Sequence, residues 1–527
     1  MKKIYCFELT INYMARAIII LFFLPVFPLT VDCQTAGAID NTFGTNGFAN
    51  SGQAVYISQF GGVLVQTDHK IICVQRVGSN SVYDIALVRF HPDGSLDNSF
   101  GNGGVALTVT AFNETPTWAV LANDGRILVG SSAFDGSSNF GVVSCYTANG
   151  SPDDSFGTNG YFISKFPGST SDGLGPVCVL PDGKIIAAGM THTTTGSSNT
   201  LIKLLPNGTL DLTFGLNGRA EGNNVYVFSM ALQKDGKILL GGRTTKKMAL
   251  TRFTSEGDID ATFGLNGLVE INYNPTNMSW AENLFVLPNG NIIGAGASTT
   301  SNLLLHDFMA AEVDSNGAII NNYGTNGVAT FSLPGAYIVT PAAAALQADN
   351  KVIIAGEVAS DTVTSKGYHF AMVRFNSNGT VDNSFGNNGV VDYTEVNRAN
   401  CDAIAIQQDN KILLGGTMNF GSGSYTIAVA RFEAGAMANG IIEPKQKAES
   451  LAIYPNPADD EITLNLEKPS NCELQIVDMH GELVKTLSIT VEKQQSLKVD
   501  LRSLIPGIYQ LILINKSGNL YGRFVKN

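Results

Sequence analysis

The sequence predicts an all-β protein, a seven-bladed β-propeller followed by a small immunoglobulin-like β-sandwich. Three observations lead to this prediction: a unit of about sixty residues recurs along the chain, each unit holds four short strand-like runs, and the pattern stops after Phe432. A repeat of this length indicates stacked units that bury their faces against one another. Four antiparallel strands per unit are typical of a propeller blade.

The repeat is clearest in a Phe-Gly cassette, for which LDNSFGNGGV at 96–105 serves as the example. Successive cassette aromatics are separated by 57, 56, 58, 49, 60 and 62 residues. Because the aromatic recurs in every unit, we expect it to pack between blades rather than to bind a ligand. The cassette aromatics are Phe43, Phe100, Phe156, Phe214, Phe263, Tyr323 and Phe385.

Each unit can be divided into strands by its turn residues. In the unit at 101–156, short apolar runs at 105–107, 118–121 and 126–130 surround an Asn-Asp-Gly turn, and Asp-Gly between two such runs is a strong hairpin signal. A third strand ends in an Arg-Phe-like pair, as in Arg89-Phe90 of the preceding unit. A further turn leads into the cassette, which we expect to form the fourth strand.

The two ends of the repeat region complement each other. The seventh unit ends at 430–432 without a cassette of its own, whereas the chain begins with an unmatched cassette at 39–44. We therefore expect the N-terminal strand to complete the last blade, which would close the ring and remove its exposed edges.

Composition changes divide the chain into four predicted segments: a signal peptide at 1–33, the propeller at 34–432, a linker at 433–450 and a C-terminal domain at 451–527. Basic residues precede an apolar stretch at 17–31 that is too short to span a bilayer, and cleavage is expected before Gln34. Translation could start at Met1 or Met14. Cleavage before Cys33 as in a lipoprotein is disfavoured because of Asp32. No later segment of the sequence is long and apolar enough to be a transmembrane span.

The charge and cysteine content exclude several classes of function. The net charge is −12 with no basic stripe, which argues against a nucleic-acid partner. The five cysteines that follow the leader show no paired spacing, so neither a disulfide scaffold nor a metal site is expected. No hydrolase, nucleotide-binding or metalloprotease motif is present, and we expect no cofactor.

Loop lengths indicate where a ligand could bind. The spacing from the Arg-like position to the cassette aromatic is always 11 residues, whereas the connections on the opposite rim vary in length. Function tends to lie on variable loops of a rigid scaffold, so we expect a site on this variable rim or at the mouth of the central channel. The candidate binding residues are Trp118, Glu114, Trp280, Glu282 and Asp402.

Alternatives remain for some of these residues. The two tryptophans could fill the core instead of stacking on a sugar. His306 and Asp307 could form a catalytic pair, but Asp84 and His369 occupy the same slot as Asp307, which favours a role at the start of a strand.

The C-terminal segment resembles the type A C-terminal sorting domain of type IX secretion. The resemblance spans 451–527 and rests on the motifs YPNPA, DMHG, LIPGIY and GRFVK, in that order. It implies export across the outer membrane of a Bacteroidota-type cell by the type IX machinery, removal of the tail, and release or attachment to surface lipopolysaccharide. Its motif residues here are Tyr454, Pro455, Asn456, Pro457, Gly507, Tyr509 and Lys526.

The repeats resemble the delta-60 repeat family through LDxxFGxxG, DGKI and ALxRF, over about 39–432, and their order is similar to that of NHL propellers. Neither family implies a particular reaction. We interpret the protein as a secreted or surface-anchored binding scaffold without catalysis, with an unidentified glycan or protein as its ligand. The alternative is a propeller-fold polysaccharide hydrolase or lyase whose site uses carboxylates of the variable rim.

Overall fold

The computed structural model describes two units of the chain, which cluster as residues 1–438 and 439–527. In the first unit it describes residues 35–55, 60–79, 82–166, 168–271, 273–274, 276–300, 304–359, 368–394, 399–419 and 425–435. In the second it describes residues 453–454, 458–466, 470–478, 483–491, 495–504, 507–515 and 518–526. The predicted signal peptide and most of the predicted linker lie outside these residues.

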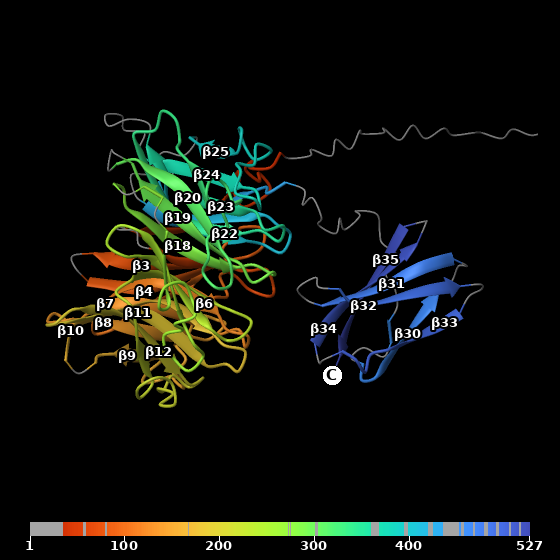
Figure 1. The fold of residues 1–527 in the computed structure, drawn as a ribbon, viewed down its shortest axis with the longest axis horizontal. Coiled ribbons are helices and arrows are strands. Elements are labelled where there is room, and N and C mark those ends of the chain that lie inside the picture. Colours follow the sequence, from red (N-terminus) through yellow and green to blue (C-terminus); the bar gives the residue numbers. More distant parts are fainter. Residues whose placement is uncertain are drawn as a thin grey trace, which may run out of the picture. The chain divides into compact units, whose positions relative to one another are not determined.

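The first unit consists of seven four-stranded antiparallel sheets, which we number as blades I to VII (Figure 1). Blade I contains β2(Phe60–Val65), β3(Ile71–Ser79), β4(Val82–Phe90) and β5(Val105–Thr108). Blade II contains β6(Asn113–Leu121), β7(Ile127–Phe134), β8(Asn139–Tyr146) and β9(Tyr161–Ser164). Blade III contains β10(Ser169–Val179), β11(Ile185–Thr193), β12(Ser197–Leu204) and β13(Arg219–Glu221). Blade IV contains β14(Tyr226–Leu232), β15(Ile238–Arg243), β16(Met248–Phe253) and β17(Leu268–Ile271).

The remaining blades have the same strand order. Blade V contains β18(Ser279–Val286), β19(Ile292–Thr299), β20(His306–Val313) and β21(Val328–Phe331). Blade VI contains β22(Ile338–Leu346), β23(Val352–Ala359), β24(His369–Phe375) and β25(Val390–Tyr393). Blade VII contains β26(Ala399–Ile406), β27(Ile412–Met418), β28(Tyr425–Phe432) and, from the start of the chain, β1(Phe48–Val55). The predicted all-β propeller is confirmed.

The ring closes as the unmatched ends of the repeat predict. Strand β1 pairs with β28 antiparallel, with Phe48 opposite Ala430, and Ile39 forms a bridge with Phe432. Asp40 accepts a hydrogen bond from Arg431 Nε at 2.7 Å. Residues that are 391 positions apart in the sequence therefore hold the first and last parts of the ring together.

The cassette differs from its prediction in one respect. In the cassette at 96–105, residues 98–101 form a turn, and the fourth strand is the segment that follows, β5. The cassette cannot be a strand because Gly101 and Gly104 have φ of 54° and 95°, in the left-handed region. A Cβ at Gly101 would lie 2.2 Å from the carbonyl oxygen of Val105, so this turn requires glycine.

The cassette also joins each blade to the next. The aromatic rings are almost fully buried, as expected for packing between blades. Arg89 Nε bonds Asp97 Oδ2 at 2.8 Å, its guanidinium lies 4.5 Å from the centroid of Phe100, and Nη1 donates to the carbonyl of Ala148 in blade II at 2.9 Å. The same three contacts recur around Arg252, Arg374 and Arg431.

The hairpin lysines take part in the same cluster. Lys70 Nζ lies 3.2 Å from Asp97 Oδ2, and Lys237, Lys351 and Lys411 make the equivalent ion pairs. Because their side chains reach across to the cassette aspartate, these lysines contribute to the contact between the second strand and the cassette.

The second unit is a small β-sandwich. One sheet has the order β29(Ile453–Tyr454), β30(Glu461–Leu466) and β33(Gln495–Asp500). The other has the order β32(Leu483–Val491), β31(Ser470–Asp478), β34(Gly507–Asn515) and β35(Gly518–Lys526). Ile462, Leu464, Leu474 and Leu511 from the two sheets share one buried core, which confirms the predicted sandwich.

The sorting-motif residues have different positions in this sandwich. Tyr454 is exposed on β29, whereas Tyr509 is buried and stacks on Phe524 with ring centroids 5.6 Å apart. Gly507 pairs with Lys526 at the end of β34 and β35. Pro455, Asn456 and Pro457 lie outside the described residues. Within the part of the chain that the structure describes, no helix is long and apolar enough to cross a bilayer.

Candidate functional site

The innermost strand of every blade carries an irregularity in its pairing. In β18 it falls between Ala281 and Asn283, and in β26 between Cys401 and Ala403, so that Glu282 and Asp402 are the extra residues. A bulge of this kind re-aims the side chain that it inserts. The equivalent irregularities in the other blades fall at Gly61, Thr117, Gly175-Pro176, Phe228 and Ala342.

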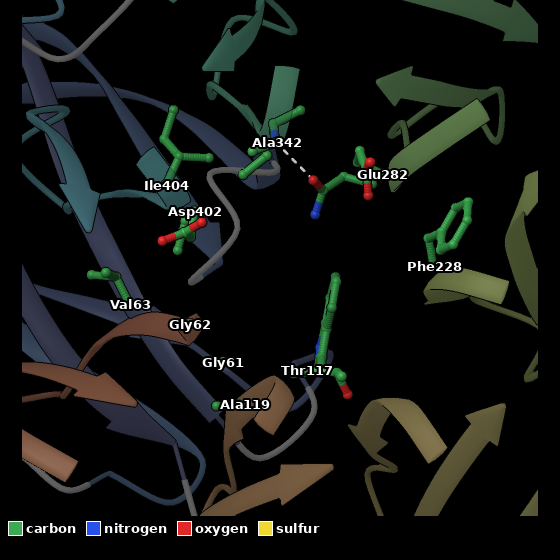
Figure 2. Close-up of a pocket in the computed structure, with 15 residues that line it drawn as sticks. Gly61, Gly62, Val63, Thr117, Ala119, Phe228, Glu282, Ala342, Asp402 and Ile404 are labelled. Carbon is green, nitrogen blue, oxygen red and sulfur yellow. Dashed lines mark hydrogen bonds between the residues drawn. The ribbon is translucent and has the colours of Figure 1, made fainter. Parts of the chain in front are cut away.

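These residues form a set that we call the bulge ring, one per blade: Gly61, Thr117, Gly175, Phe228, Glu282, Ala342 and Asp402. Each precedes by seven positions an Asp or Asn of its hairpin turn, namely Asp68, Asp124, Asp182, Asp235, Asn289, Asp349 and Asp409. All seven line one or both of two cavities in the propeller. Figure 2 shows Thr117, Phe228, Glu282, Ala342 and Asp402 around one opening, each from a different sheet. The bulge ring therefore surrounds the central channel.

The two cavities meet at the bulge ring. The first, of about 180 Å³, is lined by innermost strands and includes Glu282, Asp402 and Trp118. The second, of about 510 Å³, extends over blade III and includes Asn139, Asp172 and His192. Asn139 begins β8 and His192 lies near the end of β11, so this larger cavity reaches the rim with variable connections. Thr117, Phe228 and Glu282 line both cavities.

Glu282 and Asp402 are partly buried acids with no lysine or arginine beside them in the lining. Burial raises the pKa of Glu282 to about 7, although Trp280 Nε1 donates a hydrogen bond to its Oε1 at 2.6 Å. Burial likewise raises the pKa of Asp402 to about 6, and its Oδ2 has no hydrogen-bond partner among the described residues. Because neither cavity includes a lysine or arginine, no fixed protein cation offsets these two carboxylates there.

A third acid stands close to Asp402. Glu357 lies on β23 of blade VI, which packs against β26 of blade VII. Burial and the charge of Asp402 raise the pKa of Glu357 to about 7. Glu357 is not among the residues predicted from the sequence, because nothing in the repeat pattern marks a second-strand residue as a neighbour of the next blade's bulge.

The five candidate binding residues are therefore separated by the structure. Trp118, Glu282 and Asp402 line the channel. Trp280 does not line either cavity; it packs edge-on against His306, with centroids 5.2 Å apart, and orients Glu282. Glu114 has no exposed surface, and Ser131 Oγ donates to it at 3.3 Å within blade II, which does not fit a contact with a ligand on the rim.

The remaining candidates have structural partners. Asp307 accepts a hydrogen bond from Ser332, and His369 Nε2 lies 2.6 Å from Asp392 Oδ1, in keeping with roles near strand starts. Among the described residues, no group of three or more His, Cys, Asp or Glu is placed to hold a metal ion. The bulge ring could have been found from the sequence through its fixed distance to the hairpin turn.

Known protein families match both units of the chain. Residues 452–527 match the secretion system C-terminal sorting domain. The domain of unknown function (DUF5122) beta-propeller matches at 74–100, 122–156, 180–214, 233–263, 347–385 and 407–435. The sorting tail marks proteins that type IX secretion exports to the cell surface or the extracellular space, so the predicted export is confirmed. The unit without a match is that of blade V, in which Glu312, Ile320 and Tyr323 depart from the repeat.

Solved structures match this chain at low similarity only. A protein of unknown function from Dyadobacter fermentans is 12% identical, with 73% of this chain and 99% of that chain covered and a TM-score of 0.35. The polysaccharide lyase Uly1 is 12% identical (74% and 93% covered, TM-score 0.35), and a Penicillium chrysogenum α-L-arabinanase is 8% identical (76% and 98% covered, TM-score 0.36). At these values none of them bears on function. No curated protein matches the chain.

Proposed function

The chain joins DUF5122 β-propeller repeats to a secretion C-terminal sorting domain, and from that premise we propose that it is an exported binding protein whose central channel holds a ligand. The observation that supports this most directly is the bulge ring. Seven equivalent backbone positions converge on the channel, and they carry different side chains although the blades around them are alike. A concave site with a few convergent polar groups is the usual form of a ligand pocket.

A substitution in the bulge ring can be used to block the channel. Ala342 occupies the position that Phe228 occupies in blade IV, so the local backbone accommodates a phenylalanine there. We expect Ala342→Phe to fold and to fill part of the smaller cavity. Leu265→Phe is the matched control, because Leu265 is 80% exposed on a cassette turn and lines neither cavity.

The experiment is a screen of the purified protein against glycan and peptide arrays, repeated with both variants. We expect at least one ligand class to be retained by the wild type and by Leu265→Phe and lost by Ala342→Phe. Equal binding by all three proteins would place the site outside the channel and overturn the proposal. Attachment to lipopolysaccharide and the identity of the ligand are separate expectations from the sequence.

A second candidate function is glycoside hydrolysis in the same channel. It is favoured by the raised pKa of Glu282, about 7, because a carboxyl group that keeps its proton near neutral pH can act as a general acid. Release of reducing sugar from a panel of neutral polysaccharides, abolished by Glu282→Gln, would support hydrolysis over binding alone. Binding without turnover by the same protein would exclude it for those substrates.

A further inference from the structure

We infer that the central channel recognises a ligand that carries organic ammonium groups, for which Glu282 and Asp402 are the carboxylates in the lining; this inference rests on the proposed function and names the chemistry of its ligand. Both carboxylates line the smaller cavity, from blades V and VII, on the same opening as Thr117 of blade II (Figure 2). Trp118 of blade II also lines this cavity. Two properties of this cavity lead to the inference: its lining carries the negative charge of two carboxylates, and it contains no lysine or arginine.

The channel supplies negative charge without a lysine or arginine as counter-charge. A carboxylate that is removed from water without a partner is costly, and an opposite charge at hydrogen-bond distance offsets that cost. The buried aspartates of the cassettes are paired in this way: Asp97 with Arg89 and Lys70, and Asp260 with Arg252 and Lys237. Glu282 and Asp402 have no ion pair of this kind among the described residues, so a cationic ligand would provide what the fold does not.

The same features exclude anionic ligands. A phosphate, sulfate or uronate is bound most strongly by cationic donors at its oxygens. Neither cavity has a lysine or arginine in its lining, and Glu282 and Asp402 would repel such a group. The net charge of −12 adds a long-range repulsion of the same sign. This argues against a polyuronate substrate, and hence against a lyase for polyuronates among the functions considered.

An organic cation fits the lining better than a metal ion does. Calcium takes six to eight oxygen ligands, and no group of three or more potential ligands is placed together in the described parts of the chain. An ammonium group on a carbon skeleton needs fewer oxygens and can also contact aromatic faces, which attract cations. Trp118 and Phe228 provide aromatic surface in the lining. Amino sugars and polyamines both carry this group.

The test is isothermal titration calorimetry at low salt with two pairs of probes, at pH 7 because the amino groups of glucosamine lose most of their charge by pH 8. Each pair has one charged and one neutral member: the glucosamine tetramer with the N-acetylglucosamine tetramer, and 1,5-diaminopentane with 1,5-pentanediol. We expect at least a tenfold preference for the charged member of one pair, and the pair that shows it identifies the source as an amino sugar or a polyamine. Calcium chloride alone is titrated in parallel.

Two variants link the preference to the channel. The double variant Glu282→Gln/Asp402→Asn, which keeps the shape of both side chains, is expected to lose at least tenfold in affinity. The matched control, Glu221→Gln/Asp235→Asn, changes two exposed acids outside the cavities and is expected to bind as the wild type does.

The outcomes separate this inference from the proposed function. Equal or tighter binding of the neutral probes, lost in Ala342→Phe, would overturn the ammonium inference and leave the channel as the site. Binding of the charged probes that survives both the double variant and Ala342→Phe would overturn both. Absence of binding by all charged probes at millimolar concentration, or calcium binding that the double variant abolishes, would also overturn the ammonium inference.

Discussion

Replacing Asp40 by asparagine tests whether the ring is held shut by its first cassette. The Asp40 carboxylate is 1% exposed and lies 2.7 Å from Arg431 Nε and 2.5 Å from Lys411 Nζ. Thr42 donates two more hydrogen bonds to it. Burial alone would raise the pKa of Asp40, but these hydrogen bonds and the charge of Arg431 hold it well below its usual value.

The loss of free energy of unfolding in Asp40→Asn follows from the charges that remain. In Asp40→Asn, Arg431 stays almost fully buried beside the ring of Phe43 without its counter-ion. Breaking a buried ion pair in this way costs about 3–5 kcal/mol. An internal control exists in Asp260→Asn, because Asp260 makes the same contacts with Arg252, Lys237 and Thr262. Asp260 and Arg252 are only eight residues apart, so their contact closes no ring.

The assay combines urea unfolding with amide hydrogen exchange. Both variants are expected to lose a similar free energy of unfolding, but only Asp40→Asn is expected to speed exchange along β1, since Asp40 helps to hold this strand against β28. If exchange along β1 is as slow in Asp40→Asn as in Asp260→Asn, the ion pair does not hold the ring shut and the reasoning fails.

Two further predictions concern ionisable residues of blade II, the buried Glu114 and the partly exposed Arg126. Burial raises the pKa of Glu114 to about 7 in the folded protein, so the folded state is penalised as pH rises from about 4.5 to above 7, and Glu114→Gln should be more stable than the wild type at pH 8 by about 3 kcal/mol but not at pH 4. Urea unfolding at both pH values measures this; exposed Glu221→Gln is the control, and a gain independent of pH would contradict it. In blade II, Cys145 occupies the position at which other blades have the arginine that bonds the next blade, and Arg126 supplies the guanidinium in its place. Its Nη1 donates to the Pro206 carbonyl of blade III at 2.9 Å, so Arg126→Ala should lower the free energy of unfolding by about 1.5–3 kcal/mol. Thermal unfolding of Arg126→Ala beside Lys237→Ala checks this, and an equal, small loss in both would show that Arg126 has no such role.

The sequence predicted those parts of the fold that repeat. The fixed cassette and the Asp-Gly hairpins indicated seven sheets, and the surplus cassette at 39–44 indicated their closure, because each is a local pattern seen several times. The cassette itself was mistaken for a strand, since its apolar residues suggested pairing whereas its glycines impose φ values near 54° and 95°. Apolar content alone does not reveal a turn that buries a ring.

The site was predicted only in part, for a physical reason. Residues on an irregular strand alternate in direction only up to the bulge, so the sequence could not assign Glu114 and Glu282 to different environments. Glu114 lies before the bulge of β6 and is buried within blade II, whereas Glu282 is itself the inserted residue of β18 and faces the channel. Glu357 was missed because its proximity to Asp402 depends on how neighbouring blades pack.

The seven blades show which side chains are accepted at equivalent positions of the same backbone. At the cassette position, six blades have phenylalanine and one has tyrosine, so packing between blades dictates the side chain there. At the bulge-ring position the same backbone carries Gly, Thr, Gly, Phe, Glu, Ala and Asp. Because small, aromatic and acidic residues are all accommodated at that position, blade packing does not require an acid at Glu282 or Asp402. Two partly buried carboxylates that the fold does not need, and for which it offers no counter-ion, are better explained by something that enters the channel than by the propeller itself.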